Sequence, residues 1–410
     1  MSAATKLRLL CALYLAQGLP YGFFTQALPV LLREQGYSLR MISLTSFLFL
    51  PWALKFLWAP FVDAWGTRRA WLLPLQLAAV AGALVLALLD LDQGLWPLFI
   101  ALFFFNLVAA TQDIATDGLA VNLLSPRERG LGNAVQVGAY RVGMILGGGL
   151  LLWLYAVSGF SVMFLAMALL LALTVLPVLG LSEPPRAPAA VAAAIPVRSL
   201  LAAWMQRLRQ PGVPLFVALI CFYKFGDSMG ASLVGPYMRD AGMTKEAIAW
   251  VKGTLGSGST LLGAALGGWL AWRHGRRTAL LAGGLLQTLS LVLYALSAFG
   301  HGGHDLIALA CVAEHVLGGM AVVALFTLMM DACAPEHGST DYTLLSCALV
   351  LGHGLASFSG GMVADFAGYG VLFTTSVLLS GAGCLALVLC LDQGRGPARL
   401  QARWRSGSAS

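Results

Sequence analysis

The stretch Ala59-Pro-Phe-Val-Asp63-Ala-Trp-Gly66-Thr-Arg68-Arg69 is a short charged turn between two long apolar runs. Its echo lies 209 positions further on and reads Gly268-Trp-Leu-Ala-Trp272-Arg-His-Gly275-Arg276-Arg277. A second motif returns at nearly the same step, because Pro29-Val-Leu-Leu-Arg33-Glu-Gln-Gly36 is echoed by Pro236-Tyr-Met-Arg239-Asp-Ala-Gly242. A loop and a helix end that repeat at one spacing predict that the chain consists of two copies of one unit in parallel orientation.

The composition indicates a chain whose solvent is largely lipid. Of 410 residues, 59% are hydrophobic and only 10% are charged, whereas soluble domains have about 25% charged residues. This excludes a disordered chain, a disulfide-rich secreted scaffold and an ordinary cytosolic enzyme. The 47 glycines suit close helix packing in lipid, and the seven cysteines form no CxxC pair that would suggest a metal site.

Apolar windows of the length that a bilayer requires, about 20 residues each, predict an all-α membrane protein with twelve spans. These lie near 8–32, 40–62, 70–90, 95–123, 129–157, 160–181, 213–239, 246–272, 278–300, 305–332, 340–365 and 369–391. The expected domains are a six-helix bundle over 1–181, a linker over 182–212, a second six-helix bundle over 213–392 and a basic tail over 393–410. Within the linker, residues 198–210 could form a short amphipathic helix on the membrane surface.

The placement of the basic residues predicts the orientation and explains the net charge of +7 without a nucleic-acid partner. If the N-terminus is cytoplasmic, the inner segments hold 17 of the 25 lysines and arginines, and the outer loops hold four. The positive-inside rule therefore places both termini in the cytoplasm.

Three motifs carry a resemblance to a known family: Leu15-Ala-Gln-Gly-Leu-Pro-Tyr-Gly22, Leu50-Pro-Trp-Ala-Leu-Lys55-Phe-Leu-Trp-Ala-Pro60-Phe-Val-Asp63 and Ala110-Thr-Gln-Asp113-Ile-Ala-Thr-Asp117-Gly118. With the two six-helix halves and the charged inner loop, they resemble the AmpG-like branch of the major facilitator superfamily. That branch contains muropeptide permeases, acetyl-CoA transporters and the RhtX/FptX-type permeases that import iron-siderophores. AmpG-type permeases are often longer after the twelfth span, and this difference, with Gly22-Phe-Phe-Thr-Gln-Ala-Leu-Pro29, favours the siderophore permeases.

The resemblance implies a secondary transporter of the bacterial inner membrane that works by alternating access. We expect import of an iron-siderophore complex, with protons as the coupling ion and no cofactor, bound metal or second copy of the chain. A muropeptide permease is the alternative on the same fold. A membrane-embedded enzyme and a receptor that has lost transport are weaker alternatives, and no nucleophile–base motif supports the enzyme.

Ionisable residues within spans are expensive in lipid and are therefore candidates for function. In the first half these are Lys55, Asp113, Asp117 and Arg141. Counting helical rise from the inner loops predicts the pairs Asp113–Arg141 and Lys55–Asp117 at matching depths. A purely structural polar network is an equal alternative, because buried ion pairs often serve only specificity.

In the second half the ionisable residues are Lys224, Asp227, Lys252 and Glu314. Lys224 and Asp227 are three positions apart and should be neighbours on one helix face. We expect Asp227 or Glu314 to carry the proton, with a self-neutralised pair that lines a wet cavity as the alternative. Lys252 and Glu314 could form another pair.

Polar and aromatic side chains on the predicted first, fifth, seventh and eleventh helices could line the substrate path. They are Tyr14, Gln17, Tyr21, Gln26, Gln136, Tyr140, Tyr223 and His353. Flat rings with a few hydrogen-bonding groups suit an aromatic, partly anionic ligand, although any one of them is more often a packing residue. Five glycines, at 138, 143, 147, 148 and 149, predict a close-packing surface on the fifth helix.

The inner loop motif suggests a gate. Asp63, with Arg68 and Arg69 after Gly66, could bind the start of a neighbouring helix in one state and release it in the other. Positive-inside anchoring would explain the arginines but not the acid. In the second copy Trp272 takes the place of the acid, which argues against a gating ion pair there. The outer turn that holds His301, His304 and Asp305 is expected to be solvated rather than metal-binding.

Overall fold

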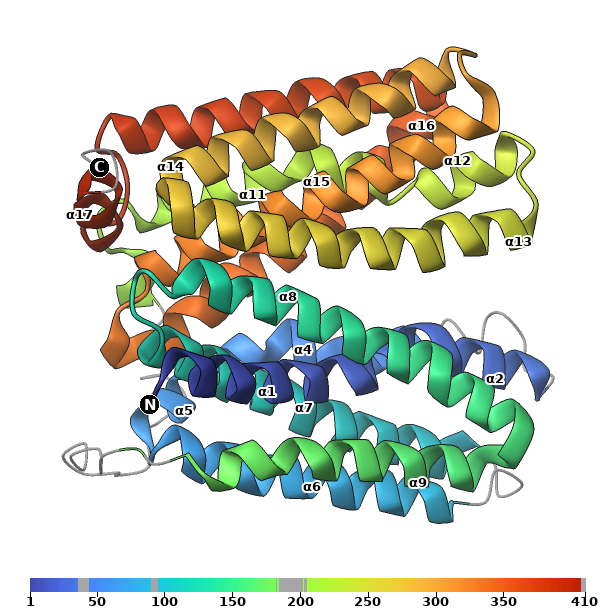
Figure 1. Ribbon diagram of the computed structural model, residues 1–410, viewed down its shortest axis with the longest axis vertical. Helices are drawn as coiled ribbons and strands as arrows, with labels where there is room; N and C mark the ends of the chain where they lie inside the picture. Colours follow the sequence, from blue (N-terminus) through green and yellow to red (C-terminus); the bar gives the residue numbers. More distant parts are fainter. Residues whose placement is uncertain (36–43, 90–94, 182, 184–201, 203–204, 407–410) are drawn as a thin grey trace. The chain divides into compact units, whose positions relative to one another are not determined.

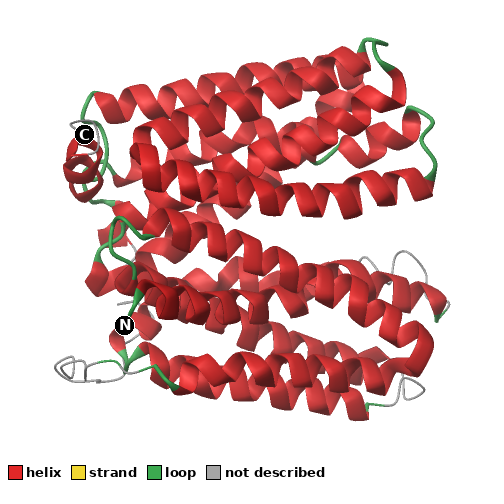
Figure 2. Cartoon of the chain, viewed as in Figure 1, coloured by secondary structure: helices red, strands yellow, loops and turns green. Residues whose placement is uncertain are grey.

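The computed structural model describes residues 1–35, 44–89, 95–181, 183, 202 and 205–406. The described part is helical throughout apart from short turns, as Figure 2 shows. Most of the predicted linker lies outside the described residues. Of the surface helix predicted over 198–210, residues 202 and 205–208 are helical.

The helices form two compact units. The first comprises residues 1–124 and 139–203 with the short segment 335–343, and the second comprises 125–138, 204–334 and 344–410. Two helices are therefore divided between the units. The helix that starts at Arg129 begins in the second unit and continues into the first, and the helix that starts at Gly338 begins in the first unit and continues into the second. The predicted domain boundaries remain a prediction.

The first unit begins with a helix that changes its winding part-way, from α1 (Ala3–Gly22) through the π-helical η1 (Phe23–Ala27) to α2 (Leu28–Glu34). The next span is in pieces, which are η2 (Leu44–Phe49), α4 (Leu50–Leu54), η3 (Lys55–Leu57) and α5 (Ala59–Ala64). Longer helices follow, namely α6 (Arg68–Leu88), α7 (Leu95–Leu123), α8 (Arg129–Ile145), the π-helical η5 (Leu146–Leu150) and α9 (Leu151–Leu179).

The second unit is built from α11 (Val213–Ala231), α12 (Val234–Asp240), α13 (Lys245–Ile248), the π-helical η6 (Ala249–Leu255), α14 (Gly256–Ala298) and α15 (Gly303–Ala332). After the turn η7 (Pro335–His337), α16 (Gly338–Asp392) begins in the first unit and continues into the second. The last helix, α17 (Ala398–Ser406), lies across the end of the second unit beside the C-terminus (Figure 1).

The helix inventory confirms twelve spans. Within the described residues, seven helical stretches are long and apolar enough to cross a bilayer. Three of them, Arg129–Leu179, Ala249–Ala298 and Pro335–Asp392, are 50 to 58 residues long. Each turns back at a glycine of positive φ within the stretch, so each holds two spans. The seven stretches therefore hold ten spans, and the two interrupted runs over 3–34 and 44–64 complete the twelve.

The backbone also confirms the internal repeat. Gly66 and Gly275 are 209 positions apart and both have positive φ, at 65° and 81°. Gly159 and Gly368 have the same separation, with φ of 85° and 80°. Left-handed backbone strongly favours glycine, so the repeat preserves the residues that allow each helical pair to turn.

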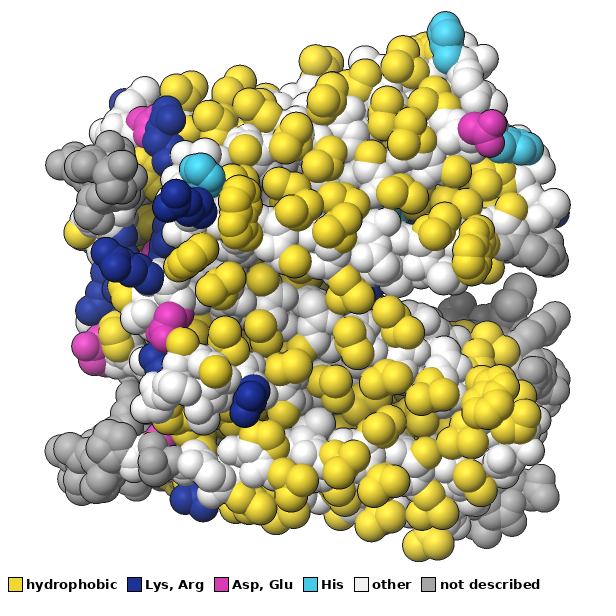
Figure 3. Space-filling view, in the orientation of Figure 1, with side chains coloured by type: hydrophobic (Ala, Val, Ile, Leu, Met, Phe, Trp, Pro, Cys, Tyr) yellow, Lys and Arg dark blue, Asp and Glu magenta, His cyan; other side chains and the backbone are white. Residues whose placement is uncertain are grey.

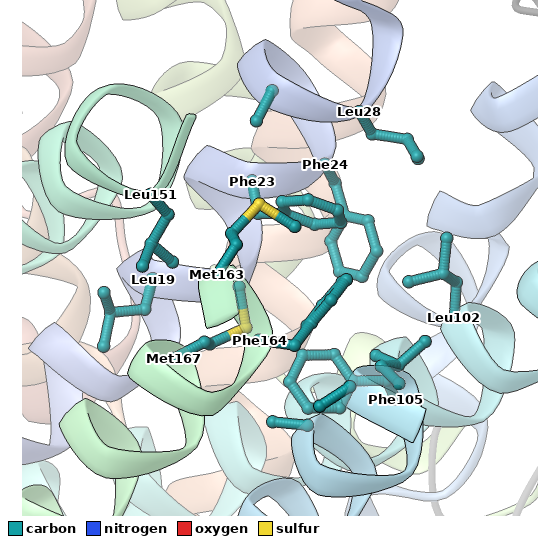
Figure 4. Close-up of a cluster of buried hydrophobic side chains, with 14 of the residues drawn as sticks. Leu19, Phe23, Phe24, Leu28, Leu102, Phe105, Leu151, Met163, Phe164 and Met167 are labelled. Atoms are coloured by element: carbon teal, nitrogen blue, oxygen red, sulfur yellow. The ribbon is translucent and has the colours of Figure 1, made fainter. Parts of the chain in front are cut away.

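Each unit has its own apolar core. In the first unit, α1, α7 and α9 contribute Leu19, Phe105 and Met163 to one cluster, around the ring of Phe164 (Figure 4). In the second, the core contains Tyr294 stacked on Phe373 with centroids 5.2 Å apart. Large apolar side chains cover the sides of the helices, and in the second unit dark-blue Lys and Arg side chains gather at the end near the C-terminus (Figure 3). This is the pattern of a bundle that lies in a bilayer.

Candidate functional site

The first unit holds a buried ion pair between Lys55 and Asp113. The ammonium also lies 5.5 Å from the ring centroid of Trp52, within range of a cation–π contact. The structure therefore joins Lys55 to Asp113, a pair that the depth count does not predict. The charge of Lys55 also acts on Asp117, and the pairs Lys55–Asp117 and Asp113–Arg141 stay predictions.

The Lys55–Asp113 pair lies where the second span is broken. The prediction assumes the rise of an α-helix along the whole second span. Lys55, however, begins the 3-10 segment η3, and Trp58 interrupts the helix before α5. A 3-10 helix rises about 2.0 Å per residue rather than 1.5 Å. Over the three residues of η3 this adds only about 1.5 Å of rise. The length of the lysine side chain therefore provides most of the reach to the deeper acid.

The other acid of α7, Asp117, accepts a hydrogen bond from the hydroxyl of Tyr14 at 2.9 Å. One turn further along α1, Gln17 is buried, and neither atom of its amide has a hydrogen-bond partner among the described residues. A buried amide without a partner is costly, so it implies a guest molecule or water at this position.

Aromatic rings surround this polar cluster on α1, α4 and α8. Tyr21 packs against Tyr140 with centroids 5.5 Å apart and against Trp52 at 6.1 Å. Arg141 adjoins these rings on α8 and places positive charge near Tyr21. Gln26 lies apart from them, with an exposed side chain in η1 against Gly148.

In the second unit, Lys224 and Asp227 form the predicted ion pair on one face of α11. Lys224 also donates to Gln287 Oε1 on α14 at 2.8 Å, whereas Oδ1 of Asp227 makes no hydrogen bond among the described residues. His353 is exposed and lies close enough to act on both charges. Tyr223 uses its hydroxyl to bind the carbonyl of Leu280 at 3.1 Å, which is a packing role.

Glu314 takes a different partner from the one predicted. Its Oε2 lies 2.8 Å from Nδ1 of its neighbour His315, which also bonds to the carbonyl of Cys311 at 2.8 Å. Lys252 and Lys224 also place positive charge near Glu314. The pairs Lys224–Asp227 and Glu314–His315 therefore act on each other, because Glu314 in turn acts on Asp227.

The motif that contains Asp63 binds the start of a helix, whereas its predicted role as a gate stays a prediction. Both oxygens of Asp63 are used at the first turn of α16: Oδ1 accepts from the backbone N–H of Ser339 at 3.1 Å, and Oδ2 accepts from the N–H and hydroxyl of Thr340, both at 2.6 Å. Arg68 pairs with the same carboxylate. An acid at the N-terminus of a helix meets unsatisfied donors and the positive end of the helix dipole.

Two other members of the motif serve the turn itself. Gly66 has φ of 65°, which a residue with a Cβ adopts only with strain. Arg69 does not reach α16; its guanidinium donates to the carbonyl of Leu179 at 3.1 Å, and its backbone N–H donates to Glu183 Oε2 at 2.8 Å.

A comparable site in the second unit corrects the prediction made from Trp272. Asp331, at the end of α15, is fully buried and pairs with Arg276 of the second motif at 2.8 Å. It also pairs with Arg129, the first residue of α8, at 2.6 Å. The acid missing from position 272 is therefore supplied by another helix. Its only signal in the sequence is a lone acid at the end of an apolar span.

The whole chain matches one family model. The model of the Major Facilitator Superfamily matches residues 10–338 and again 220–409. The chain belongs to the major facilitator superfamily. The two overlapping matches agree with the two copies seen in the backbone.

Curated relatives place this facilitator within the AmpG-like branch. An anhydromuropeptide permease of Escherichia coli is 30% identical over 395 residues, which cover 93% of this chain and 79% of that protein. A putative AmpG 4 transporter of Rickettsia felis is 23% identical over 385 residues, covering 89% and 92%. The facilitator is thus a multipass membrane protein whose relatives are transporters.

A solved structure supports the fold alone. The proton:xylose symporter XylE superposes with a TM-score of 0.69 at 12% identity, and the match covers 98% of each chain. At this identity the likeness carries no information on the substrate of this facilitator.

Proposed function

We propose that the chain is an inner-membrane permease that imports anhydromuropeptides by alternating access, with protons as the coupling ion. The observation that carries the proposal is the 30% identity with an anhydromuropeptide permease across 93% of the chain. It favours the muropeptide alternative over the iron-siderophore, because one relative is named an anhydromuropeptide permease and another a putative AmpG transporter.

The polar cluster of the first unit suits such a substrate. Anhydromuropeptides join an amino sugar to a short peptide, so they present hydroxyl and amide groups together with carboxylates. The unpartnered amide of Gln17 can exchange hydrogen bonds with a sugar, the ring of Tyr21 offers a flat face, and Arg141 supplies positive charge for a carboxylate.

The second unit offers the groups for coupling to protons. Asp227 is buried, pairs with Lys224 through Oδ2 and keeps Oδ1 without a hydrogen bond among the described residues. A carboxylate in this position can take up a proton when its surroundings change and then release Lys224. Glu314 beside His315 is the second candidate for the same task.

Uptake into cells that lack their own muropeptide permease tests the proposal. Cells that express the chain receive labelled anhydromuropeptide or labelled ferric siderophore, each with and without a protonophore. Muropeptide uptake that the protonophore abolishes supports both parts of the proposal. Siderophore uptake alone would contradict the substrate, and muropeptide uptake that resists the protonophore would contradict the coupling.

A further inference from the structure

The C-terminal helix α17 reaches the buried carboxylate at the end of α15. Arg403 of α17 lies 2.9 Å from Oδ1 of Asp331, the same oxygen that binds Arg129 at 2.6 Å. Arg276 occupies the other oxygen. One fully buried acid therefore joins three arginines from three separate parts of the chain: the start of α8, the turn within α14 and the tail.

A second acid repeats this arrangement one residue along the tail. Trp404 donates its indole N–H to Oδ1 of Asp392 at 3.0 Å, and the same carboxylate holds Arg277 at 2.9 Å. The two consecutive arginines of the second inner motif and two consecutive residues of α17 thus share two acids. This arrangement fixes both the position and the rotation of the tail helix.

Buried apolar side chains also hold α17 against the second unit. Leu400 is fully buried and Trp404 nearly so, although the helix lies beyond the last span. Arg399 points its guanidinium at the carbonyl of Cys333, 3.5 Å away, and the Cys333 side chain is buried. A helix held only by adventitious charge contacts would not bury two large apolar side chains.

We infer that α17 is a latch on the charged cluster around Asp331, held through Arg403 on Asp331 and Trp404 on Asp392. Alternating access requires the contacts at the inner ends of the helices to break once in each cycle. Asp331 holds the start of α8 through Arg129, and α8 continues into the other unit. A tail that binds the same oxygen stabilises this cluster and must loosen its hold before the start of α8 can move. This inference rests on transport by alternating access and not on the identity of the substrate.

The native residue Cys333 can report whether α17 has left its binding site. Cys333 lies two residues after Asp331, is buried and is contacted by α17 through its carbonyl. In a variant that keeps Cys333 and replaces the other six cysteines with serine, a maleimide measures its exposure in nanodiscs. We expect Arg403→Gln and Trp404→Phe each to increase the labelling rate about ten-fold, which corresponds to about 1.4 kcal/mol. Arg395→Gln removes the same charge from an exposed position of the tail and should leave the rate unchanged.

A second reporter separates opening of the gate from simple fraying of the tail. Ser339→Cys, in a background without other cysteines, places a thiol at the buried start of α16 beside Asp63. This position belongs to the first unit, whereas α17 belongs to the second. The latch predicts that Arg403→Gln exposes this thiol as well, because the inner contacts open together. Labelling that rises only at Cys333, or at neither position, would overturn the inference, and neither result depends on which substrate is carried.

Discussion

Asp63 accepts a hydrogen bond of 2.6 Å from the backbone N–H of Thr340, which lies 277 positions later in the chain. The same carboxylate binds the Thr340 hydroxyl and pairs with Arg68. Gly118 of α7 allows this approach, because a Cβ there would lie 3.0 Å from the Cβ of Ser339. A motif from the first half thus recognises the first turn of a helix that belongs mainly to the second.

Replacing this acid should weaken the contact between the Asp63 loop and the start of α16. Asp63→Asn turns an acceptor oxygen into a donor that faces the N–H groups of α16, and hydrogen bonds to charged groups contribute about 1.5–3 kcal/mol. We expect uptake to fall about ten-fold or more and a thiol at Ser339→Cys to become reactive. Asp305→Asn, an exposed acid in the first turn of α15, is the control. Unchanged reactivity at position 339 would show that Asp63 does not hold the gate.

Close packing of α1 on α8 should make Gly143 intolerant of substitution. A Cβ on Gly143 would lie 2.8 Å from Cα of Gly18 and 2.5 Å from the carbonyl oxygen of Leu15. We expect Gly143→Ala to destabilise the protein by about 1–3 kcal/mol, as overpacking typically does. Gly138→Ala on the same helix is the matched control, since its nearest neighbour is a leucine methyl at 3.9 Å. Thermal unfolding in detergent measures both, and an equal Tm for the two variants would refute this account.

Variants of the Lys55–Asp113 pair can distinguish a structural role of the pair from a role in transport. Lys55→Met or Asp113→Leu alone leaves a buried charge without its partner, which costs about 3–5 kcal/mol. The double variant removes both charges and should recover most of the lost Tm. If the pair serves transport, muropeptide uptake stays low in the stable double variant. Recovery of uptake together with Tm would instead favour the purely structural network.

The proposed proton-coupling role of Asp227 can be tested with a variant that cannot bind and release a proton. Asp227→Asn keeps the size of the side chain but cannot take up and release a proton, so we expect it to abolish uphill uptake. Exchange of labelled for unlabelled substrate across the membrane should continue, because it requires no net proton movement. Glu314→Gln tests the second candidate in the same assay. Uphill uptake that persists in Asp227→Asn would remove this residue from the mechanism.

The sequence was sufficient for the architecture because the bilayer restricts the choices. A span in lipid must form its backbone hydrogen bonds within itself, so the length and hydropathy of a segment predict a helix. The repeated motifs predicted the two copies, and φ at Gly66 and Gly275 confirms them. Local pairs were also predictable: Lys224 and Asp227 are one helical turn apart, and their geometry follows from the helix alone.

Partners on different helices depended on details that spacing does not encode. Lys55 pairs with Asp113 at a break in the second span, and the periodicity of the sequence does not predict that break. The role of Asp331 was hidden for the same reason, because Arg129, Arg276 and Arg403 approach it from positions 202, 55 and 72 residues away.

The sequence by itself determined the twelve spans, the repeat and the turn glycines, since these follow from hydropathy and from backbone sterics within short stretches. Only the tertiary structure decided which charges meet. Burial makes an unpaired charge so costly that each one takes whichever partner the packing brings within reach. That partner is set by helix breaks and by contacts across hundreds of residues, as between Asp63 and Thr340.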